Sequence, residues 1–539
     1  MEGFKECAGS QVLNDPAASR GRRLPERVQL VWFKRDLRVS DHRPLVEASA
    51  RGRVLCVYIY EPELLHSAEF GGRHLQFINE ALKELAVELA RLGGVLITRQ
   101  GEAVKELNRL ARECNIAALW SHAETGNRIT YDRDVRVQTW CEQQGIEWRQ
   151  FRQDGVVRAL RDRDGWSRRW NQLMSEELLP APEVIRGVRR VSSAGFLDAR
   201  RLGLDPDCLD ARDPGGETAA RSSLNSFLER RGVNYRSDMS SPVDGWTGCS
   251  RLSSYLAWGC ISVRSVHHAA RERQADITAA RSAGVSVDPR WSPSLRSFQS
   301  RLRWRCHFMQ KLEDEPELEF HNLCRSYDGL RENEFNEERF EAWKSGGTGY
   351  PMVDACMRAV AATGWLNFRM RAMVVSFASY HLWLHWRRTG VHLGRLFVDF
   401  EPGIHYSQVQ MQSGTTGINA VRIYSPSKQV RDQDPTGLFI RRWLPELEGV
   451  PDKFLPEPHL MSRGDQQRFG CLIGRDYPFP IVEHGSAYRE ARRRVMAVRK
   501  KPEVRAAAQK VFVKHGSRKK NNRRKPTRVR GNKAQLPLL

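Results

Sequence analysis

The most constraining feature of this sequence is a change in its hydrophobic pattern near residue 155. Before that point, short apolar runs alternate with longer amphipathic stretches; after it, strand-like runs almost vanish and patterns of helical period dominate. Alternating strands and helices are typical of a doubly wound parallel sheet. We therefore predict an α/β N-terminal domain with a doubly wound parallel sheet (Rossmann-like), followed by an all-α C-terminal domain.

The α/β domain is predicted to begin at Val28. Its expected strands are VQLVWF, VLCVYIY, VLITRQG, IAALWSH and IEWRQFR, in that order. Ligands of such sheets bind at the carboxyl ends of the strands, so the loop Lys34–Asp41 after the first strand is a natural site. For Arg35, Asp36 and Arg38 in this loop, structural ion pairing is the simpler interpretation.

The chain is long enough for two or more domains, because 539 residues exceed the size at which a single core stops growing. Residues 180–216 are rich in Arg, Asp, Pro and Gly, which is typical of a connection between domains. The predicted parts are a flexible leader (1–27), the α/β domain (28–155), a connector (156–220), the helical domain (221–498) and a basic tail (499–539).

Charge points to a nucleic-acid partner. The net charge is +23, and no Asp or Glu follows Glu503. The stretch GSRKKNNRRKPTRVRGNK near the C-terminus is expected to be a cationic tail that is disordered when free. It would bind phosphate backbones by counterion release, and a nuclear-import signal is an alternative role for it. No apolar run could span a bilayer and no secretory signal is evident, so we expect a cytoplasmic monomer without a membrane partner, nucleoid-associated if bacterial, with the nucleus left open.

The eleven cysteines contain no closely spaced pair. Neither a disulfide framework nor a metal site is therefore predicted, and a reducing compartment fits. An iron–sulfur cluster built from distant cysteines is the less favoured alternative.

Two blocks of the sequence carry a family resemblance. The first is WFKRDLRVSDHRPL; the second runs from Trp343 to Pro445 and includes TGYPMVDACMRAV, TGWLNFRMRAMVVSF and VDFEPGIHYSQVQMQSGTTG. Both resemble the photolyase/cryptochrome family, and the resemblance extends from Val28 to about Tyr477. It implies FAD in a helical bowl, DNA with a flipped-out lesion as the substrate, and an antenna pigment of the folate, deazaflavin or lumazine type.

The resemblance assigns a set of residues to the cofactor. The segment GCSRLSSYLAWG is similar to the family's phosphate-binding segment, where N–H groups at a helix start suit a pyrophosphate; an ordinary helix N-cap is the simpler interpretation. Arg305 is expected to pair with Asp399, because a buried guanidinium needs a carboxylate; a purely structural pair is the alternative. The implied cofactor-binding residues are Tyr235, Cys249, Ser250, Leu252, Ser253, Arg305, Trp365, Arg371, Asp399, Glu401 and His405.

The chain departs from the family pattern at positions that the resemblance places beside the flavin and the lesion. The run Leu366–Arg369 (LNFR) lacks the family's usual histidine, which weakens an assignment to (6-4) lesions. His405 stands where the family commonly has Asn beside the reactive flavin nitrogen. It is expected to tune the flavin redox state; a satisfied structural histidine is the alternative.

The photoreducing tryptophan chain and the lesion contacts also differ. Val409 stands where the flavin-proximal Trp belongs and Met411 where a lesion-stacking Trp belongs, whereas Trp386 matches the middle Trp. An electron route through Trp383 or Tyr406 is left as a hypothesis. The catalytic candidates are Trp386, His405, Arg369 and Asn367; the DNA-contacting candidates are Phe298, Arg301, Arg369 and Met411.

The resemblance implies two functions of different classes. The first, preferred for its basic charge, is a deoxyribodipyrimidine photo-lyase, in which excited reduced FAD passes an electron to a flipped cyclobutane pyrimidine dimer. The alternative, favoured by the altered contacts and His405, is a cryptochrome-like blue-light receptor that signals through a protein partner. A third hypothesis is an FAD-binding nucleic-acid protein without photochemistry.

Overall fold

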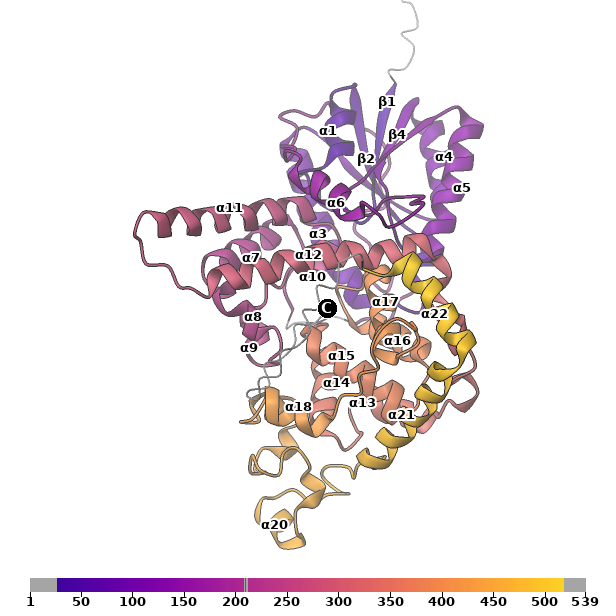
Figure 1. The fold of residues 1–539 in the computed structure, drawn as a ribbon. Helices are drawn as coiled ribbons and strands as arrows, with labels where there is room; N and C mark the ends of the chain where they lie inside the picture. The colour runs from indigo at the N-terminus through magenta and orange to yellow at the C-terminus, as the bar shows by residue number, and fades with distance from the viewer. Residues whose placement is uncertain (1–26, 208, 210–211, 518–539) are drawn as a thin grey trace, which may run out of the picture.

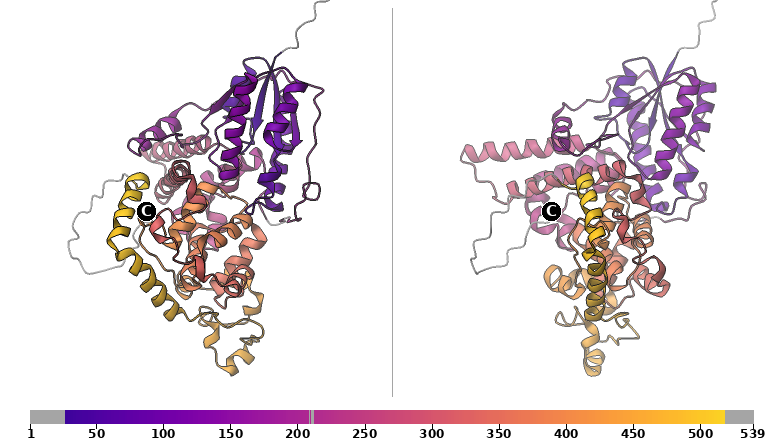
Figure 2. Two further views of the ribbon diagram at one scale, coloured as in Figure 1. Left: turned by 90° about the vertical axis from the view of Figure 1, so that its right-hand side faces the viewer. Right: turned by 45° about the vertical axis from the view of Figure 1, so that its right-hand side comes forward.

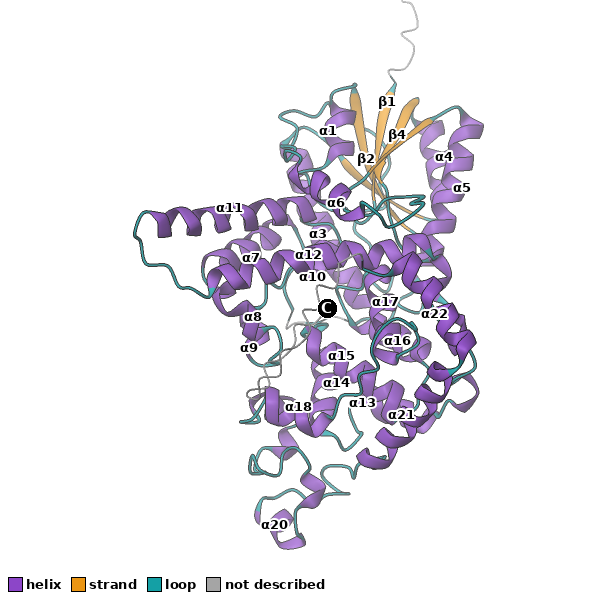
Figure 3. Cartoon of the chain, in the orientation of Figure 1, coloured by secondary structure: helices purple, strands orange, loops and turns teal. Residues whose placement is uncertain are grey.

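The computed structural model describes residues 27–207, 209 and 212–517. In these residues the chain divides into an α/β domain and a helical domain (Figure 1). The strands of the sheet all lie in the α/β domain, as Figure 3 shows. The predicted leader, apart from its last residue, and the cationic end of the predicted tail lie outside the described residues.

Five parallel strands form the sheet in the order β3-β2-β1-β4-β5. The order reverses direction between β1 and β4, which is the doubly wound arrangement that was predicted. The strands lie where the apolar runs predicted them. They are β1 (Val28–Phe33), β2 (Arg53–Tyr60), β3 (Leu96–Gln100), β4 (Ile116–His122) and β5 (Glu147–Phe151).

The central strand β1 is buried along its whole length, which explains its nearly continuous apolar sequence. Its side chains alternate between two cores, because successive residues of a strand point to opposite faces. Leu30 and Trp32 pack on one face, and Val31 and Phe33 on the other. The single polar residue, Gln29, accepts a hydrogen bond from the indole of Trp120 at 2.8 Å.

Helices cover both faces of this sheet (Figure 1). Leucines of α4 pack in the core of Leu30 and Trp32, together with Val137 of α5, whereas leucines of α3 pack in the core of Val31 and Phe33. The helices of this domain are α1 (Arg43–Ser49), α2 (Pro62–Leu65), α3 (Gly72–Arg91), α4 (Ala103–Glu113) and α5 (Arg128–Gln144).

The described residues after the α/β domain are mainly helical, and α12 crosses this part directly below the α/β domain in Figures 1 and 2. α12 packs against α11 and α17. None of the helices between residues 27 and 517 combines the length and apolar composition that a membrane span requires. The helices are α6 (Trp166–Ser175), α7 (Glu217–Glu229), α8 (Tyr235–Asp238), α9 (Asp244–Gly248), α10 (Ser253–Ala257), α11 (Val263–Ser282), α12 (Trp291–Asp314), α13 (Glu337–Ser345), α14 (Pro351–Thr363), α15 (Phe368–Ser376), α16 (Trp386–Leu396), α17 (Pro402–Ser413), α18 (Pro426–Gln433), α19 (Leu438–Trp443), α20 (Arg463–Arg468), α21 (His484–Lys500) and α22 (Pro502–His515).

Some segments differ from their sequence-based expectation. The connector 156–220 contains α6 and the start of α7, and the segment 499–539 contains α22. The segment 250–259, which the resemblance assigns to phosphate binding, contains only the five-residue α10. Arg251 before it and Gly259 after it have φ of 61° and 70°, which an α-helix excludes. Gly259 is required there, since a Cβ would meet the backbone of the Lys34–Asp41 loop at 2.2 Å.

Arg73 of α3 links the two domains. Its side chain is buried and makes a bidentate pair with Asp207, at 2.7 and 2.9 Å. The same guanidinium donates to the carbonyls of Val360 and Ala361 in the last turn of α14 and of Leu396 at the end of α16. Carbonyls at a helix C-terminus lack partners within the helix and carry the negative end of its dipole, so a cation suits this position.

The variant Arg73→Met should lower the free energy of unfolding by about 3 kcal/mol, because it leaves buried carbonyls and a carboxylate without their cation. Chemical denaturation measures this loss. Arg91→Met is the control, because Arg91 is exposed and forms a surface ion pair with Glu88. Equal stabilities of the two variants would contradict the role given to Arg73.

Candidate functional site

A cavity of about 340 Å³ opens in the helical domain. Its walls come from α10, α12, α15 and α17 and from the loop before α10. The volume lies within the range of sites for small molecules. Nearly all residues assigned from the sequence line it: Tyr235, Cys249, Ser250, Leu252, Ser253, Phe298, Arg301, Arg305, Trp365, Asn367, Arg371, Asp399, Glu401, His405 and Met411.

Two assigned residues do not line this cavity. Arg369 on α15 is half-buried, and its Nε has no hydrogen-bond partner among the described residues. Trp386 at the start of α16 is fully buried, and its indole N–H donates to Oδ1 of Asn322 at 2.7 Å. Trp386 therefore lies behind the cavity wall.

Two ion pairs stand in the cavity wall. Arg371 binds Asp399 through two hydrogen bonds, at 2.9 and 2.8 Å, and Arg305 binds Glu401 at 3.0 Å. The prediction that Arg305 pairs with Asp399 is therefore wrong. The two carboxylates are two residues apart at the start of α17, and each faces the cation of a different helix, Arg371 of α15 and Arg305 of α12.

The two carboxylates differ in their tendency to ionise. Burial would raise the pKa of Asp399, but Arg371 outweighs it and holds that pKa below its ordinary value. Burial raises the pKa of Glu401, and the opposing effects of Arg35 and Arg305 do not cancel it. The cavity wall thus contains one firmly ionised carboxylate and one that takes up a proton more readily.

Arg251 is a functional candidate that the sequence argument missed. Its guanidinium packs against both Trp246 and Trp365, 4.4 and 4.0 Å from their ring centroids, and pairs with Asp213 through Nε and Nη2. The remaining nitrogen, Nη1, is buried without a partner among the described residues, although Arg251 lines the cavity. A fixed guanidinium with one free N–H suits an anionic group.

The position of Arg251 in the sequence could have identified it as a candidate. It lies between the two serines of GCSRLSSYLAWG that were assigned to phosphate binding. Its positive φ is rare for a residue with a side chain, and such strain is common at functional sites. Ser250 Oγ makes only a long contact of 3.5 Å with the N–H of Leu252, so it does not act as the helix N-cap.

Two further polar atoms of cavity-lining residues have no partner among the described residues. They are Oδ1 of Asn367 and Oε1 of Gln408, both buried. The amide nitrogen of Asn367 is held by the carbonyls of Met239 and Ser241, each at 3.2 Å, so its oxygen is fixed in orientation. Because buried polar atoms are rarely left unsatisfied, this wall fits a ligand with several polar groups.

His405 offers a hydrogen-bond acceptor to the cavity. Its Nε2 lies 2.7 Å from the carbonyl oxygen of Gly390 and must be the donor. Burial lowers the pKa of His405 to about 4, so the ring is neutral near pH 7 and its Nδ1 carries the lone pair. The histidine is thus held by one nitrogen, as the structural interpretation expects, while the other is an acceptor.

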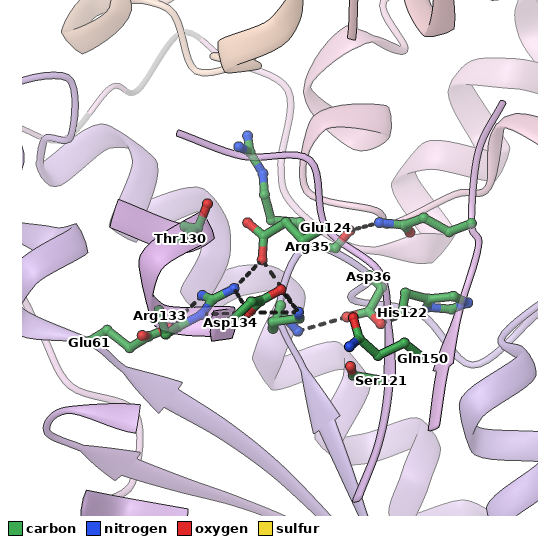
Figure 4. Close-up of polar contacts among 12 residues, drawn as sticks. Arg35, Asp36, Glu61, Ser121, His122, Glu124, Thr130, Arg133, Asp134 and Gln150 are labelled. Atoms are coloured by element: carbon green, nitrogen blue, oxygen red, sulfur yellow. Dashed lines mark hydrogen bonds and ion pairs between the residues drawn. The ribbon is translucent and has the colours of Figure 1, made fainter. Parts of the chain in front are cut away.

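A second polar cluster lies at the carboxyl ends of the strands (Figure 4). Lys34 binds Asp134 at 3.2 Å, and Arg133 binds Glu61, Glu124 and Asp134 at 2.7 to 2.8 Å. All five side chains are largely buried. These charges pair with one another.

Asp36 is the centre of a hydrogen-bond network in the predicted strand-end loop. With His42 and His122 it forms the one group of three potential metal ligands within the described ranges. Nδ1 of His42 accepts the N–H of Leu45, so its Nε2 carries the proton and donates to Asp36 at 3.0 Å. A neutral His42 therefore has no free lone pair for a metal. His122 donates to the same carboxylate oxygen at 2.7 Å.

The arginines of this loop bind the helical domain rather than Asp36. Arg35 donates to the carbonyls of Ala257 and Phe400, and Arg38 to that of Gly259. The two arginines therefore have a structural role, but through carbonyl groups rather than through ion pairs, whereas Asp36 contacts His42 and His122. The loop instead anchors the segments that form the cavity.

Family models match both domains. A model described as "DNA photolyase" matches residues 29–162, and one described as "FAD binding domain of DNA photolyase" matches residues 298–497. The second match covers α12 and α17, which carry Arg305, His405 and Met411 of the cavity.

Known proteins are similar over nearly the whole chain. A cryptochrome DASH of Gloeobacter violaceus is 28% identical over 483 residues, covering 84% of this chain and 93% of that protein. A deoxyribodipyrimidine photo-lyase of Streptomyces griseus is 29% identical over 482 residues, covering 85% and 97%. The crystal structure of a class III photolyase from Agrobacterium tumefaciens has a TM-score of 0.75 at 25% identity, covering 90% of this chain and 100% of that one. The chain belongs to the photolyase/cryptochrome family.

Proposed function

We propose that this protein is a light-driven repair flavoenzyme that opens cyclobutane pyrimidine dimers in DNA. The observation that carries the proposal is the cavity, whose walls bring together two ion pairs, cationic residues and buried polar atoms that have no partner among the described residues. Relatives named deoxyribodipyrimidine photo-lyase support it. The fold and the FAD-binding domain are those of the family.

FAD fits the polar groups of the cavity. Arg251 has the free N–H that a pyrophosphate would accept, and Ser250 and Ser253 lie beside it. Asn367 and His405 offer fixed acceptors that suit the N–H groups of a flavin ring. When bound, FAD supplies light-driven one-electron chemistry.

Side chains of the cavity would exclude water from a bound flavin ring and would bind DNA. Leu256, Phe397 and Val409 give the cavity apolar surface that keeps solvent from a bound ring. Arg301 and Arg422, which also line the cavity, would hold phosphates or bases of a substrate strand. The net charge of +23 supports association with DNA.

Blue-light reception with a protein partner is the second candidate function. Val409 and Met411 line the cavity at positions where the family resemblance implies tryptophans, and His405 replaces an Asn. These changes favour a receptor, since they alter the electron route and the lesion contacts. Relatives named cryptochrome DASH are compatible with it.

Blue light should restore intact thymines in an oligonucleotide that carries one cyclobutane dimer, when the purified, FAD-loaded and reduced protein is present. Chromatography of the oligonucleotide measures the repair, and a dark sample is the control. If the flavin is bound and reduced but the dimer persists in light, the repair proposal is wrong and the receptor function takes its place.

Arg251→Met should weaken FAD binding by about 10- to 100-fold, because it removes a charge-assisted hydrogen bond from a buried site. Titration of the apoprotein with FAD, followed by flavin fluorescence, measures the dissociation constant. Arg493→Met is the control, since Arg493 is exposed and pairs with Glu490. Wild-type affinity in the Arg251 variant would exclude Arg251 from the cofactor site.

His405 should make stability depend on pH. Its folded-state pKa of about 4 lies below the value of about 6.5 in an unfolded chain. Below pH 6.5 the unfolded chain therefore takes up a proton that the folded chain does not. The contribution of His405 is complete above pH 6.5 and is lost between pH 6.5 and 4, by about 3 kcal/mol.

The variant His405→Asn removes this pH-dependent contribution to the free energy of unfolding. Between pH 7 and pH 4 its free energy of unfolding should fall by about 3 kcal/mol less than that of the wild type. Denaturation at a series of pH values measures the difference, and His66→Asn, at an exposed position, should follow the wild type. Parallel curves for His405→Asn and the wild type would show that the ring is not held neutral by burial.

A further inference from the structure

We propose that Tyr406, with Glu69 as its proton acceptor, is an electron donor to the cofactor cavity. The proposal rests on the function proposed above, because it requires a photoexcited flavin as the oxidant. It assigns a redox role to a residue pair that joins the two domains.

Tyr406 lies one side-chain layer behind the cavity wall. It belongs to α17 and is fully buried. Its ring centroid is 5.4 Å from that of His405 and 6.2 Å from that of Phe400, and both of these residues line the cavity. On another side, the ring of Trp386 lies 6.2 Å away. An electron leaving Tyr406 or Trp386 therefore has only a short distance to cross.

The hydroxyl of Tyr406 donates a hydrogen bond to Oε1 of Glu69. Glu69 comes from the loop before α3 in the α/β domain, and it is also buried. Burial, together with the charge of Glu69, raises the pKa of Tyr406 well above its ordinary value. The phenol therefore keeps its proton at rest. Oxidation makes a phenol strongly acidic, so the proton then has a carboxylate within hydrogen-bond reach to receive it.

Trp386 has no comparable acceptor within the described part of the chain. Its indole N–H donates to the amide oxygen of Asn322, which is a very weak base. A positive charge formed on Trp386 would keep its proton and stay high in energy. If Tyr406 then gives an electron to the oxidised Trp386, the phenol can lose its proton to Glu69 and the positive charge disappears from the aromatic rings. The radical should therefore be most stable on Tyr406.

The step balances in atoms and electrons. One electron passes from Tyr406 to the photoexcited oxidised flavin, either directly or through Trp386. The phenol O–H bond breaks and its proton goes to Glu69, which leaves a neutral tyrosyl radical and a carboxylic acid. An added thiol, as the external reductant, returns one electron and the proton comes back from Glu69.

A matched control exists in the same chain. Tyr477 is also fully buried, and its hydroxyl also donates to a carboxylate, Asp354, at 2.6 Å. Neither tyrosine lines the cavity, but the ring of Tyr406 lies against the lining residues Phe400 and His405, whereas among the described residues no ring contact joins Tyr477 to a residue of the cavity wall. The two tyrosines therefore share their hydrogen-bond chemistry and differ in their relation to the cofactor cavity.

The test uses the full chain loaded with oxidised FAD. Electron paramagnetic resonance after blue light should detect a neutral tyrosyl radical, whose spectrum narrows when the protein carries ring-deuterated tyrosine. Tyr406→Phe should lose this radical and slow flavin photoreduction roughly tenfold or more. Glu69→Gln should slow radical formation and abolish its solvent isotope effect, while Tyr477→Phe should behave as the wild type.

The outcomes separate this proposal from the proposed function. Flavin content is measured first by absorption, and a wild-type protein that holds no flavin overturns both. If the wild type holds and photoreduces flavin without a tyrosyl radical, or if Tyr406→Phe keeps the radical, the role of Tyr406 is overturned alone. Glu69→Gln decides the matter should Tyr406→Phe fail to fold, because an unchanged rate of radical formation and an unchanged isotope effect in that variant would exclude the Tyr406–Glu69 pair as the donor.

Discussion

The buried ion pair of Arg305 and Glu401 fixes the arrangement on which the cavity depends. Arg305 lies in the middle of α12 and Glu401 precedes the first residue of α17, so their contact at 3.0 Å sets the two helices against each other. A buried charge without its partner is strongly destabilising, so the helices cannot separate without a large free-energy cost. Arg35 of the α/β domain donates to the carbonyl of Phe400, the residue before Glu401, and thereby connects the sheet to the same point.

Secondary-structure elements were more predictable from the sequence than the side-chain contacts between them. The strands β1, β2 and β4 were predictable because they are apolar runs between turn residues, and the more polar β5 because it continues the alternation of strands and helices. The membership of the cavity wall was implied by family motifs. The partner of Arg305 was not predictable, since spacing along the chain does not say which of Asp399 and Glu401 faces which helix. The backbone conformation of Arg251 was not predictable either, because its left-handed φ depends on tertiary contacts with two tryptophans.

Neighbouring residues of α17 have different chemistry because they point in different directions. His405 faces the cavity as a neutral acceptor, held by the carbonyl of Gly390. The next residue, Tyr406, faces the α/β domain and binds Glu69. Successive residues of an α-helix are about 100° apart around its axis, so one turn of helix serves both a ligand site and a domain interface. The family motif alone does not indicate this division.

The most direct test of this account is a crystal structure of the full chain loaded with FAD. The account predicts that the pyrophosphate accepts a hydrogen bond from Nη1 of Arg251 and that Nδ1 of His405 accepts one from the cofactor. It also predicts that the Arg371–Asp399 and Arg305–Glu401 pairs persist beside the cofactor. A flavin bound outside this cavity, or bound within it without contact to Arg251, would contradict the account.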